Sequence, residues 1–265
     1  KGYRRGKVLG HAFGPDPHVP DFSYIKGDLT GHYRSTKVER FVRSFVFLNL
    51  KDGDVPAAVI VHDRVIARRP EFKKTWLLHS IEEPRIDGNT CVIERTTDGY
   101  GGKLVNVTLL PAAPQLTKVG GPGREFADYH GVNWPESLNV TSSSETGAWR
   151  VELSPAAPAR ADNFLNVMQA MRTSQAPLPV THIDSGRLEG AALKDRVVLF
   201  SKTGERLGGA LEITFGGTGL LQVLVADLAA GTWQVAGPVR TRAEVSEEAG
   251  VLYFRGPAGT YRLSR

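Results

Sequence analysis

Arg43-Ser-Phe-Val-Phe-Leu-Asn-Leu50 is a run of aromatic and branched side chains, and a run of this composition and length is typical of a β-strand. Lys51-Asp-Gly-Asp54 follows with residues that favour a turn, and Ala57-Ala-Val-Ile-Val-His-Asp-Arg-Val65 is the next apolar run. Further runs of this kind lie at residues 74–81, 89–95, 103–110, 148–153 and 163–171. Short apolar runs that are regularly separated by turn residues predict an all-β fold, an antiparallel β-sandwich.

Two stretches are less regular than the rest. Residues 163–171 carry Leu165, Met168 and Met171 at three-residue intervals, which also fits a helix, and the neighbouring runs favour a strand. Residues 111–147 contain clusters of Pro and Gly, and a loop of this length in a compact domain is usually functional or disordered.

The chain divides near a polar, proline-containing stretch, Thr173-Ser-Gln-Ala-Pro-Leu-Pro179, which has the composition of a linker. A second set of short apolar runs follows it, at residues 180–183, 196–200, 211–215, 220–225, 231–235, 251–255 and 259–263. We therefore expect two parts, a β-sandwich in residues 1–175 and a smaller C-terminal β-sandwich in residues 176–265.

Composition excludes several classes of protein. With 41% hydrophobic and 23% charged residues among 265, the chain is too apolar to be disordered. A single cysteine, Cys91, excludes an internal disulfide framework and a cysteine-based zinc motif. No apolar stretch approaches the roughly 20 residues that a membrane span needs. The net charge of +5 suits an anionic partner, and the densest basic stretch, residues 64–74, is too interrupted to be a nucleic-acid tail.

Histidines are the first candidates for chemistry. Six ionisable side chains crowd the N-terminal region, namely His11, Asp16, His18, Asp21, Asp28 and His32. They could form a metal or acid/base cluster, but none has the spacing of a metal motif, which favours ordinary polar groups in a proline-rich loop. His62 and His79 lie inside apolar runs, which favours hydrogen-bonded histidines on the core or on a sheet face.

The loop at residues 120–134 is the second candidate. It offers four candidate substrate-binding residues, Arg124, Tyr129, His130 and Trp134. Aromatic rings stack on the apolar faces of sugars, and a guanidinium fits a carboxylate or sulfate with two hydrogen bonds. The alternative is that these aromatic side chains only pack the loop onto the sheet.

Several long stretches carry a family resemblance. They are Gly6-Lys-Val-Leu-Gly-His-Ala-Phe-Gly-Pro-Asp16, Pro20-Asp-Phe-Ser-Tyr-Ile-Lys-Gly-Asp-Leu-Thr30, Phe72-Lys-Lys-Thr-Trp-Leu-Leu-His-Ser-Ile-Glu-Glu-Pro84, Val119-Gly-Gly-Pro-Gly-Arg-Glu-Phe126, Asp227-Leu-Ala-Ala-Gly-Thr-Trp-Gln-Val235 and Leu252-Tyr-Phe-Arg-Gly-Pro-Ala-Gly-Thr-Tyr-Arg-Leu263. In this order they resemble the C-terminal β-sandwich part of the heparinase II/III-type polysaccharide lyases, over nearly the whole chain.

The resemblance implies an enzyme with an N-terminal α/α toroid, a large central β-sandwich and a smaller C-terminal β-sandwich. This chain would supply the later part of the central sandwich and all of the last one. The family cleaves uronic-acid polymers by β-elimination, and its catalytic Tyr and His residues and its zinc site are expected upstream of Lys1. The resemblance therefore implies no catalytic or metal-binding residue and no cofactor in this chain.

The expected function is that of a non-catalytic part of a lyase for heparin-like or heparan-sulfate-like glycosaminoglycans, which supports and flanks the substrate cleft. The alternative is a free-standing β-sandwich module that binds acidic glycans without cleaving them. The resemblance further implies an acidic polysaccharide as partner, contact with the chain's own toroid, a possible homodimer, and a periplasmic or secreted location.

Overall fold

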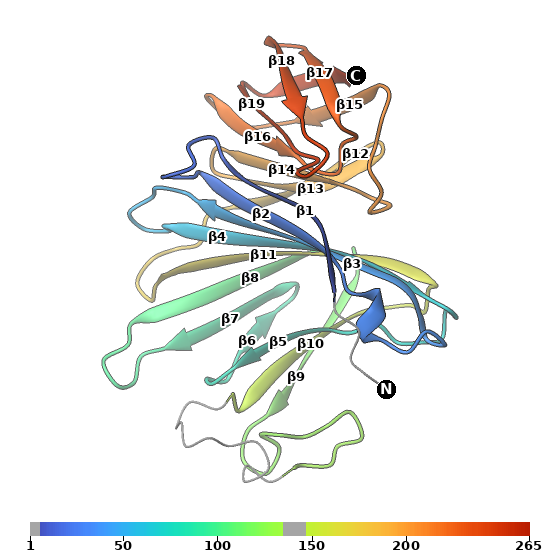
Figure 1. Ribbon diagram of the computed structural model, residues 1–265. Coiled ribbons are helices and arrows are strands. Elements are labelled where there is room, and N and C mark those ends of the chain that lie inside the picture. Colours follow the sequence, from blue (N-terminus) through green and yellow to red (C-terminus); the bar gives the residue numbers. More distant parts are fainter. Residues whose placement is uncertain (1–5, 135–146) are drawn as a thin grey trace.

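The computed structural model describes residues 6–134 and 147–265, and Figure 1 shows that these residues form stacked β-sheets. They contain no α-helix, and their one helical turn is a short 3-10 helix, η1 (Thr30–His32). None of these residues belongs to a helix that is long and apolar enough to cross a membrane. The all-β class predicted from the sequence is confirmed.

The first two sheets contain β1 to β11. The larger has eight strands in the order β1 (Lys7–Gly14), β2 (Phe22–Asp28), β3 (Val38–Asn49), β4 (Ala57–Ala67), β11 (Ala161–Arg172), β8 (Gly102–Leu110), β7 (Thr90–Arg95) and β6 (Arg85–Asp87). The smaller has three strands, β5 (Trp76–Ser80), β10 (Trp149–Pro155) and β9 (Pro114–Gly120). All pairings in these two sheets are antiparallel.

The other two sheets contain β12 to β20. One has five strands, β12 (Val180–Ser185), β13 (Leu188–Leu193), β14 (Arg196–Ser201), β16 (Leu221–Val225) and β19 (Leu252–Gly256). The other has four, β15 (Leu211–Phe215), β20 (Gly259–Ser264), β17 (Gly231–Ala236) and β18 (Arg240–Val245). One pairing, β14 with β16, is parallel, and the others are antiparallel.

Three apolar cores hold these sheets in a stack (Figure 1). The first lies between the eight-stranded and five-stranded sheets, where Val46 and Leu165 belong to the same cluster as Phe200. The second, around Trp233 and Tyr261, lies between the five-stranded and four-stranded sheets. A small third core joins the three-stranded sheet to the eight-stranded one. The expected boundary at residues 175 and 176 stays a prediction, because one continuous core joins the sheets on its two sides.

Buried polar contacts reinforce the joint between the eight-stranded and five-stranded sheets. The Lys26 ammonium in β2 pairs with the Asp227 carboxylate, and both side chains are buried. His62 in β4 lies 2.8 Å from Glu189 in β13, and its ring stacks on Phe200 with the ring centroids 4.9 Å apart. Polar groups of this kind are costly to bury unless paired, so these contacts favour one relative placement of the two sheets.

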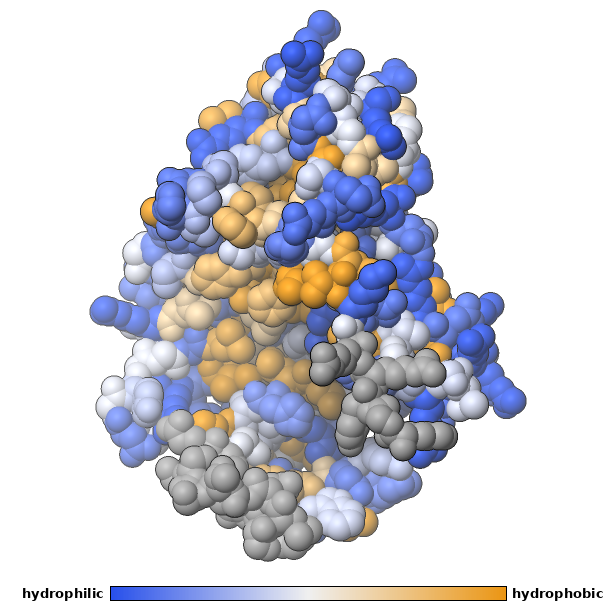
Figure 2. Space-filling model, in the orientation of Figure 1, coloured by the Kyte–Doolittle hydropathy of each residue, from blue (hydrophilic) through white to orange (hydrophobic). Residues whose placement is uncertain are grey.

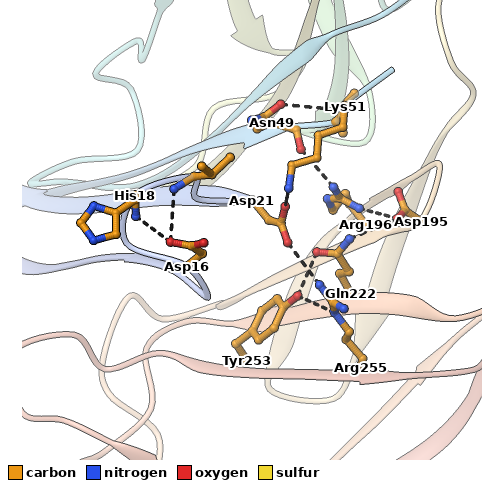
Figure 3. Close-up of polar contacts among 12 residues, drawn as sticks. Asp16, His18, Asp21, Asn49, Lys51, Asp195, Arg196, Gln222, Tyr253 and Arg255 are labelled. Atoms are coloured by element: carbon orange, nitrogen blue, oxygen red, sulfur yellow. Dashed lines mark hydrogen bonds and ion pairs between the residues drawn. The ribbon is translucent and has the colours of Figure 1, made fainter. Parts of the chain in front are cut away.

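A second polar cluster lies at one edge of the same joint (Figure 3). The Asp21 carboxylate accepts from Lys51 at 2.6 Å and from Arg255 of β19 at 3.3 Å. Arg196 of β14 donates to the backbone oxygen of Asn49 at 3.0 Å. Burial acts to raise the pKa of Asp21, but the hydrogen bond and charge of Lys51 outweigh it and hold that pKa below its ordinary value.

The N-terminal region differs from its expected form, since residues 7–14 and 22–28 form the paired strands β1 and β2, and only the proline-containing connection at residues 15–21 is a loop. The sequence of these strands shows no alternation of apolar and polar residues, because a buried lysine, Lys26, and two buried glycines occupy core positions. Position 10 has room only for glycine, because a Cβ there would lie 2.9 Å from the backbone oxygen of Ala249. The sequence also failed to indicate β6, β9, β13 and β18, whereas residues 163–171 belong to a strand, β11, as favoured. Residues 135–146 of the irregular stretch lie outside the described part.

Candidate functional site

A groove of about 960 Å³ is the candidate site. Its floor is the face of the eight-stranded sheet that turns away from the five-stranded sheet, near the edge of the three-stranded sheet. The floor side chains come from β3, β4 and β11, and they are Phe41, Arg43, Asp63, Val65, Ala67 and Phe164. Residues 33–38 and residues 71–77 form its walls, and Tyr129 reaches it from the loop at residues 120–134.

The wall at residues 71–77 is anchored where the chain crosses from β4 to β5. Lys74 is buried there, and its ammonium lies 2.9 Å from the Asp162 carboxylate and also donates to the Ala159 oxygen. Trp76 beside it is buried in the core between the two sheets. Phe72 lies under the Lys37 ammonium, which is 5.3 Å from the ring centre, so the two walls are in contact.

The floor is organised by one ion pair between neighbouring strands. Arg43 and Asp63 are directly opposite in the β3–β4 register, and the guanidinium donates from Nε to Oδ1 and from Nη2 to Oδ2, both at 2.7 Å. Asp63 is buried, whereas 39% of the Arg43 side chain is exposed. Burial acts to lower the pKa of Arg43, and the bonds and charge of Asp63 outweigh it, so that pKa is raised and the arginine stays charged.

Further cations stand at the rim. Arg34, Lys37 and Lys73 line the groove with exposed side chains, and none of them forms an ion pair with another described residue. The two lining carboxylates are each paired with an arginine, Asp63 with Arg43 on the floor and Glu71 with Arg69 at 3.8 Å. The groove therefore presents excess positive charge, which attracts anions.

Aromatic rings are exposed at the same rim. Tyr33 is 51% exposed and packs edge-on against Phe41, with ring centres 5.5 Å apart. Tyr129 is 87% exposed, and its ring centre lies 3.9 Å from that of His130. Flat exposed rings beside cations that lack an ion-pair partner among the described residues suit a ligand with apolar faces and anionic groups, which is the chemistry of an acidic sugar.

The four predicted binding residues do not gather at the groove, although the rings of Tyr129 and His130 are in contact with each other. Arg124, Tyr129, His130 and Trp134 are all exposed, and only Tyr129 lines the groove. Asp128 organises the loop, because its carboxylate accepts from the backbone of His130 at 2.8 Å and from the Trp134 indole at 3.2 Å. The substrate-binding role of these residues stays a prediction.

Sequence reasoning missed most of the groove. Arg34, Lys37, Arg43 and Lys73 are spread over 40 positions, and only the strand pairing brings them together. A signal was present in residues 64–74, the densest basic stretch, because this stretch contains Phe72 and is followed by Trp76.

The histidines do not converge. His11 lies 3.3 Å from Glu248 at the surface, and His18 is exposed, with its backbone N–H donating to Asp16 (Figure 3). His32 and His79 are exposed too, and only His62 is buried. Within residues 6–134 and 147–265, no three His, Cys, Asp or Glu side chains gather in a way that could hold a metal ion. The zinc expected upstream of Lys1 stays a prediction.

One comparison concerns the C-terminal part of the chain. Residues 182–265 match the family model of the heparinase II C-terminal domain. Among solved structures, the heparan sulfate lyase HepC from Pedobacter heparinus is similar with 16% identity and a TM-score of 0.45, over 71% of this chain and 26% of that chain. Heparinase III is similar with 9% identity and a TM-score of 0.42, over the same shares.

This chain therefore spans about a quarter of the length of these lyase structures. No curated protein matches the chain. The family match at residues 182–265 is the observation that connects it to lyases.

Proposed function

We propose, from the match of residues 182–265 to the family model of the heparinase II C-terminal domain, that the whole chain is the β-sandwich part of a polysaccharide lyase. Its substrate is a uronic-acid-containing glycosaminoglycan of the heparin or heparan sulfate kind. The chain binds and flanks the polymer, and the groups that perform the elimination lie on a toroid upstream of Lys1. An exported, periplasmic or secreted protein is part of this proposal, because such polymers lie outside the cytoplasm.

The chemistry divides naturally between two such parts. β-Elimination requires a neutralised uronate carboxylate, a base that removes the proton at C5 and an acid that protonates the departing O4. These groups act only when they converge on one sugar. Binding the rest of the polymer requires cations and flat rings along a groove, and this supports assigning that task to the groove of Arg43, Lys37 and Tyr33.

An exposed apolar face supports contact with a further part of the protein. Phe13, Ile25, Phe45 and Phe47 are exposed on one face of β1, β2 and β3, where Ile25 pairs with Phe45 in the register. Figure 2 shows apolar side chains gathered across the middle of the molecule. Contiguous apolar surface usually marks an interface, and we assign this one to the protein's own toroid. A homodimer contact at the same face is the competing assignment.

The alternative function is a free-standing module that binds acidic glycans without cleaving them. One observation favours it, namely that exposed cations such as Lys37 and exposed rings such as Tyr33 lie together at the groove. The reading frame upstream of Lys1 discriminates the two functions. A long open frame that encodes a helical toroid supports the lyase, and a start codon directly upstream of Lys1 supports the module.

The test compares the 265-residue chain with the longer product of that frame. Both are applied to immobilised heparin and to neutral dextran, and both are incubated with heparin, heparan sulfate and chondroitin sulfate while the ultraviolet absorbance of unsaturated uronates is followed. We expect both proteins to be retained on heparin alone and only the longer one to release unsaturated product. Elimination by the short chain, or no retention of it on heparin, would contradict the proposal.

A further inference from the structure

We propose that the groove over β3 and β4 is a subsite for one acidic sugar residue, in which Arg43 contacts the anionic group and Asp63 positions Arg43. The ligand chemistry is an oxyanion on a sugar ring, either the carboxylate of a uronate or a sulfate. This inference rests on the proposed function, because an acidic glycan must reach the chain, but it assigns the residues that the glycan contacts.

The donor geometry of Arg43 carries the argument. A guanidinium has five N–H donors, and Asp63 takes two of them, one on Nε and one on Nη2. The remaining end-on fork, formed by Nη1 and the second N–H of Nη2, has no acceptor among the described protein residues. With 39% of the side chain exposed and lining the groove, this fork is available to a second oxyanion.

Arg43 is also held in place before any ligand arrives. Two hydrogen bonds to a buried carboxylate fix the plane of the guanidinium, and the Phe41 ring lies with its centre 5.5 Å from the guanidinium carbon. A long, flexible side chain normally loses rotamer entropy on binding, so an arginine immobilised by its own protein binds an anion with less entropic loss. Asp63 acts here as a positioning residue.

The surroundings select an acidic sugar over a simple anion. Arg34, Lys37 and Lys73 add three cations at the rim that form no ion pair with another described residue, which suits a ligand with several anionic groups. Tyr33 and Tyr129 present exposed rings to the same space, and these can stack on the apolar face of a pyranose. The groove volume of about 960 Å³ accommodates a short oligosaccharide rather than a single ion.

The test is calorimetric titration of the 265-residue chain with a heparin tetrasaccharide. Because Arg43→Gln leaves Asp63 buried without its partner, the principal variant is the charge-neutral pair Arg43→Gln/Asp63→Asn. The control is Arg242→Gln, which removes one exposed arginine of β18 in the four-stranded sheet. We expect the pair variant to raise Kd at least about tenfold, the range of one charge-assisted hydrogen bond, and the control to stay within about twofold.

The positioning role is tested with Asp63→Asn alone, against native, carboxyl-reduced and desulfated tetrasaccharides. If Asp63 positions Arg43, this variant no longer prefers the native tetrasaccharide over the one that lacks the oxyanion contacted by Arg43. Loss of the preference over the carboxyl-reduced ligand identifies a carboxylate, and loss of the preference over the desulfated ligand identifies a sulfate. A merely structural role would weaken all three ligands equally and would overturn the assignment of Asp63.

The outcomes separate this inference from the proposed function. Unchanged affinity of a folded pair variant, as judged by its circular dichroism, overturns the assignment of the groove and leaves the proposed function standing. Failure of the unaltered chain to bind any acidic glycan overturns both.

Discussion

Replacement of Lys26 by methionine is expected to destabilise the joint between the eight-stranded and five-stranded sheets. The Lys26 ammonium contacts the Asp227 carboxylate and donates to the Gly204 oxygen at 2.8 Å, and its side chain is buried. Methionine has a similar length and no charge. Asp227 would keep the Ser201 backbone N–H at 3.1 Å and a long contact of 3.5 Å with the Tyr24 hydroxyl, and it would lose its counter-charge.

The magnitude follows from the burial of the remaining carboxylate. Breaking a buried ion pair by removing one partner costs about 3–5 kcal/mol, because the other charge stays uncompensated in the interior. For a domain of this size, 1 kcal/mol corresponds to a Tm shift of about 2–4 °C, so we expect Tm to fall by roughly 6–20 °C. The double variant Lys26→Met/Asp227→Asn should recover most of this loss, and asparagine tolerates the positive φ of 63° at position 227.

Thermal and urea unfolding followed by circular dichroism measure the effect. The matched control is Lys202→Met, which breaks the exposed pair of Lys202 with Asp184 and should cost about 1 kcal/mol or less. The reasoning is refuted if Lys26→Met is no less stable than this control. It is also refuted if the double variant is as unstable as the single one, since the unpaired charge would then not be the cause.

Three further predictions concern acid stability, backbone packing and the loop. The pKa of Asp21 is lowered in the folded state, so its stabilising contribution is present above the ordinary carboxyl pKa and is lost as pH falls through the pKa of the folded state. Asp21→Asn should therefore flatten the decline of Tm between about pH 5 and pH 2. An unchanged decline would contradict this reasoning. Gly190→Ala should lower Tm by several degrees, because its Cβ would lie 1.9 Å from the Val198 oxygen, whereas Gly53→Ala, with nothing within 4 Å, should leave Tm nearly unchanged. Tyr129→Ala and Arg124→Ala should each weaken heparin affinity with little change in Tm, since both side chains are exposed, and equal losses of affinity for neutral dextran would count against a specific role.

The strands that sequence alone predicted are those whose burial alternates without interruption. β15 is an example, with Leu211, Ile213 and Phe215 buried and the residues between them exposed. β1 and β2 were missed because their core positions include glycines and Lys26, and a buried lysine is explained only by Asp227, about 200 positions away. No local pattern contains that partner.

The candidate site was predicted only in part, for a similar reason. Tyr129 was identified because the loop at residues 120–134 collects glycines, aromatic rings and an arginine in one stretch. Arg43 was read as an ordinary strand residue, since its role depends on facing Asp63 across the β3–β4 register and on being left uncovered by the three-stranded sheet. Both conditions depend on the tertiary structure, so the alternation of apolar and polar residues along one strand cannot predict them.

Hydrogen–deuterium exchange of the 265-residue chain with and without a heparin octasaccharide tests the central claim most directly, namely that this β-sandwich binds an acidic glycan in the groove over β3 and β4. The account predicts slower exchange at residues 33–43 and 71–77 in the presence of the octasaccharide, and no change with neutral dextran. Protection confined to the four-stranded sheet, or no protection anywhere, would contradict it.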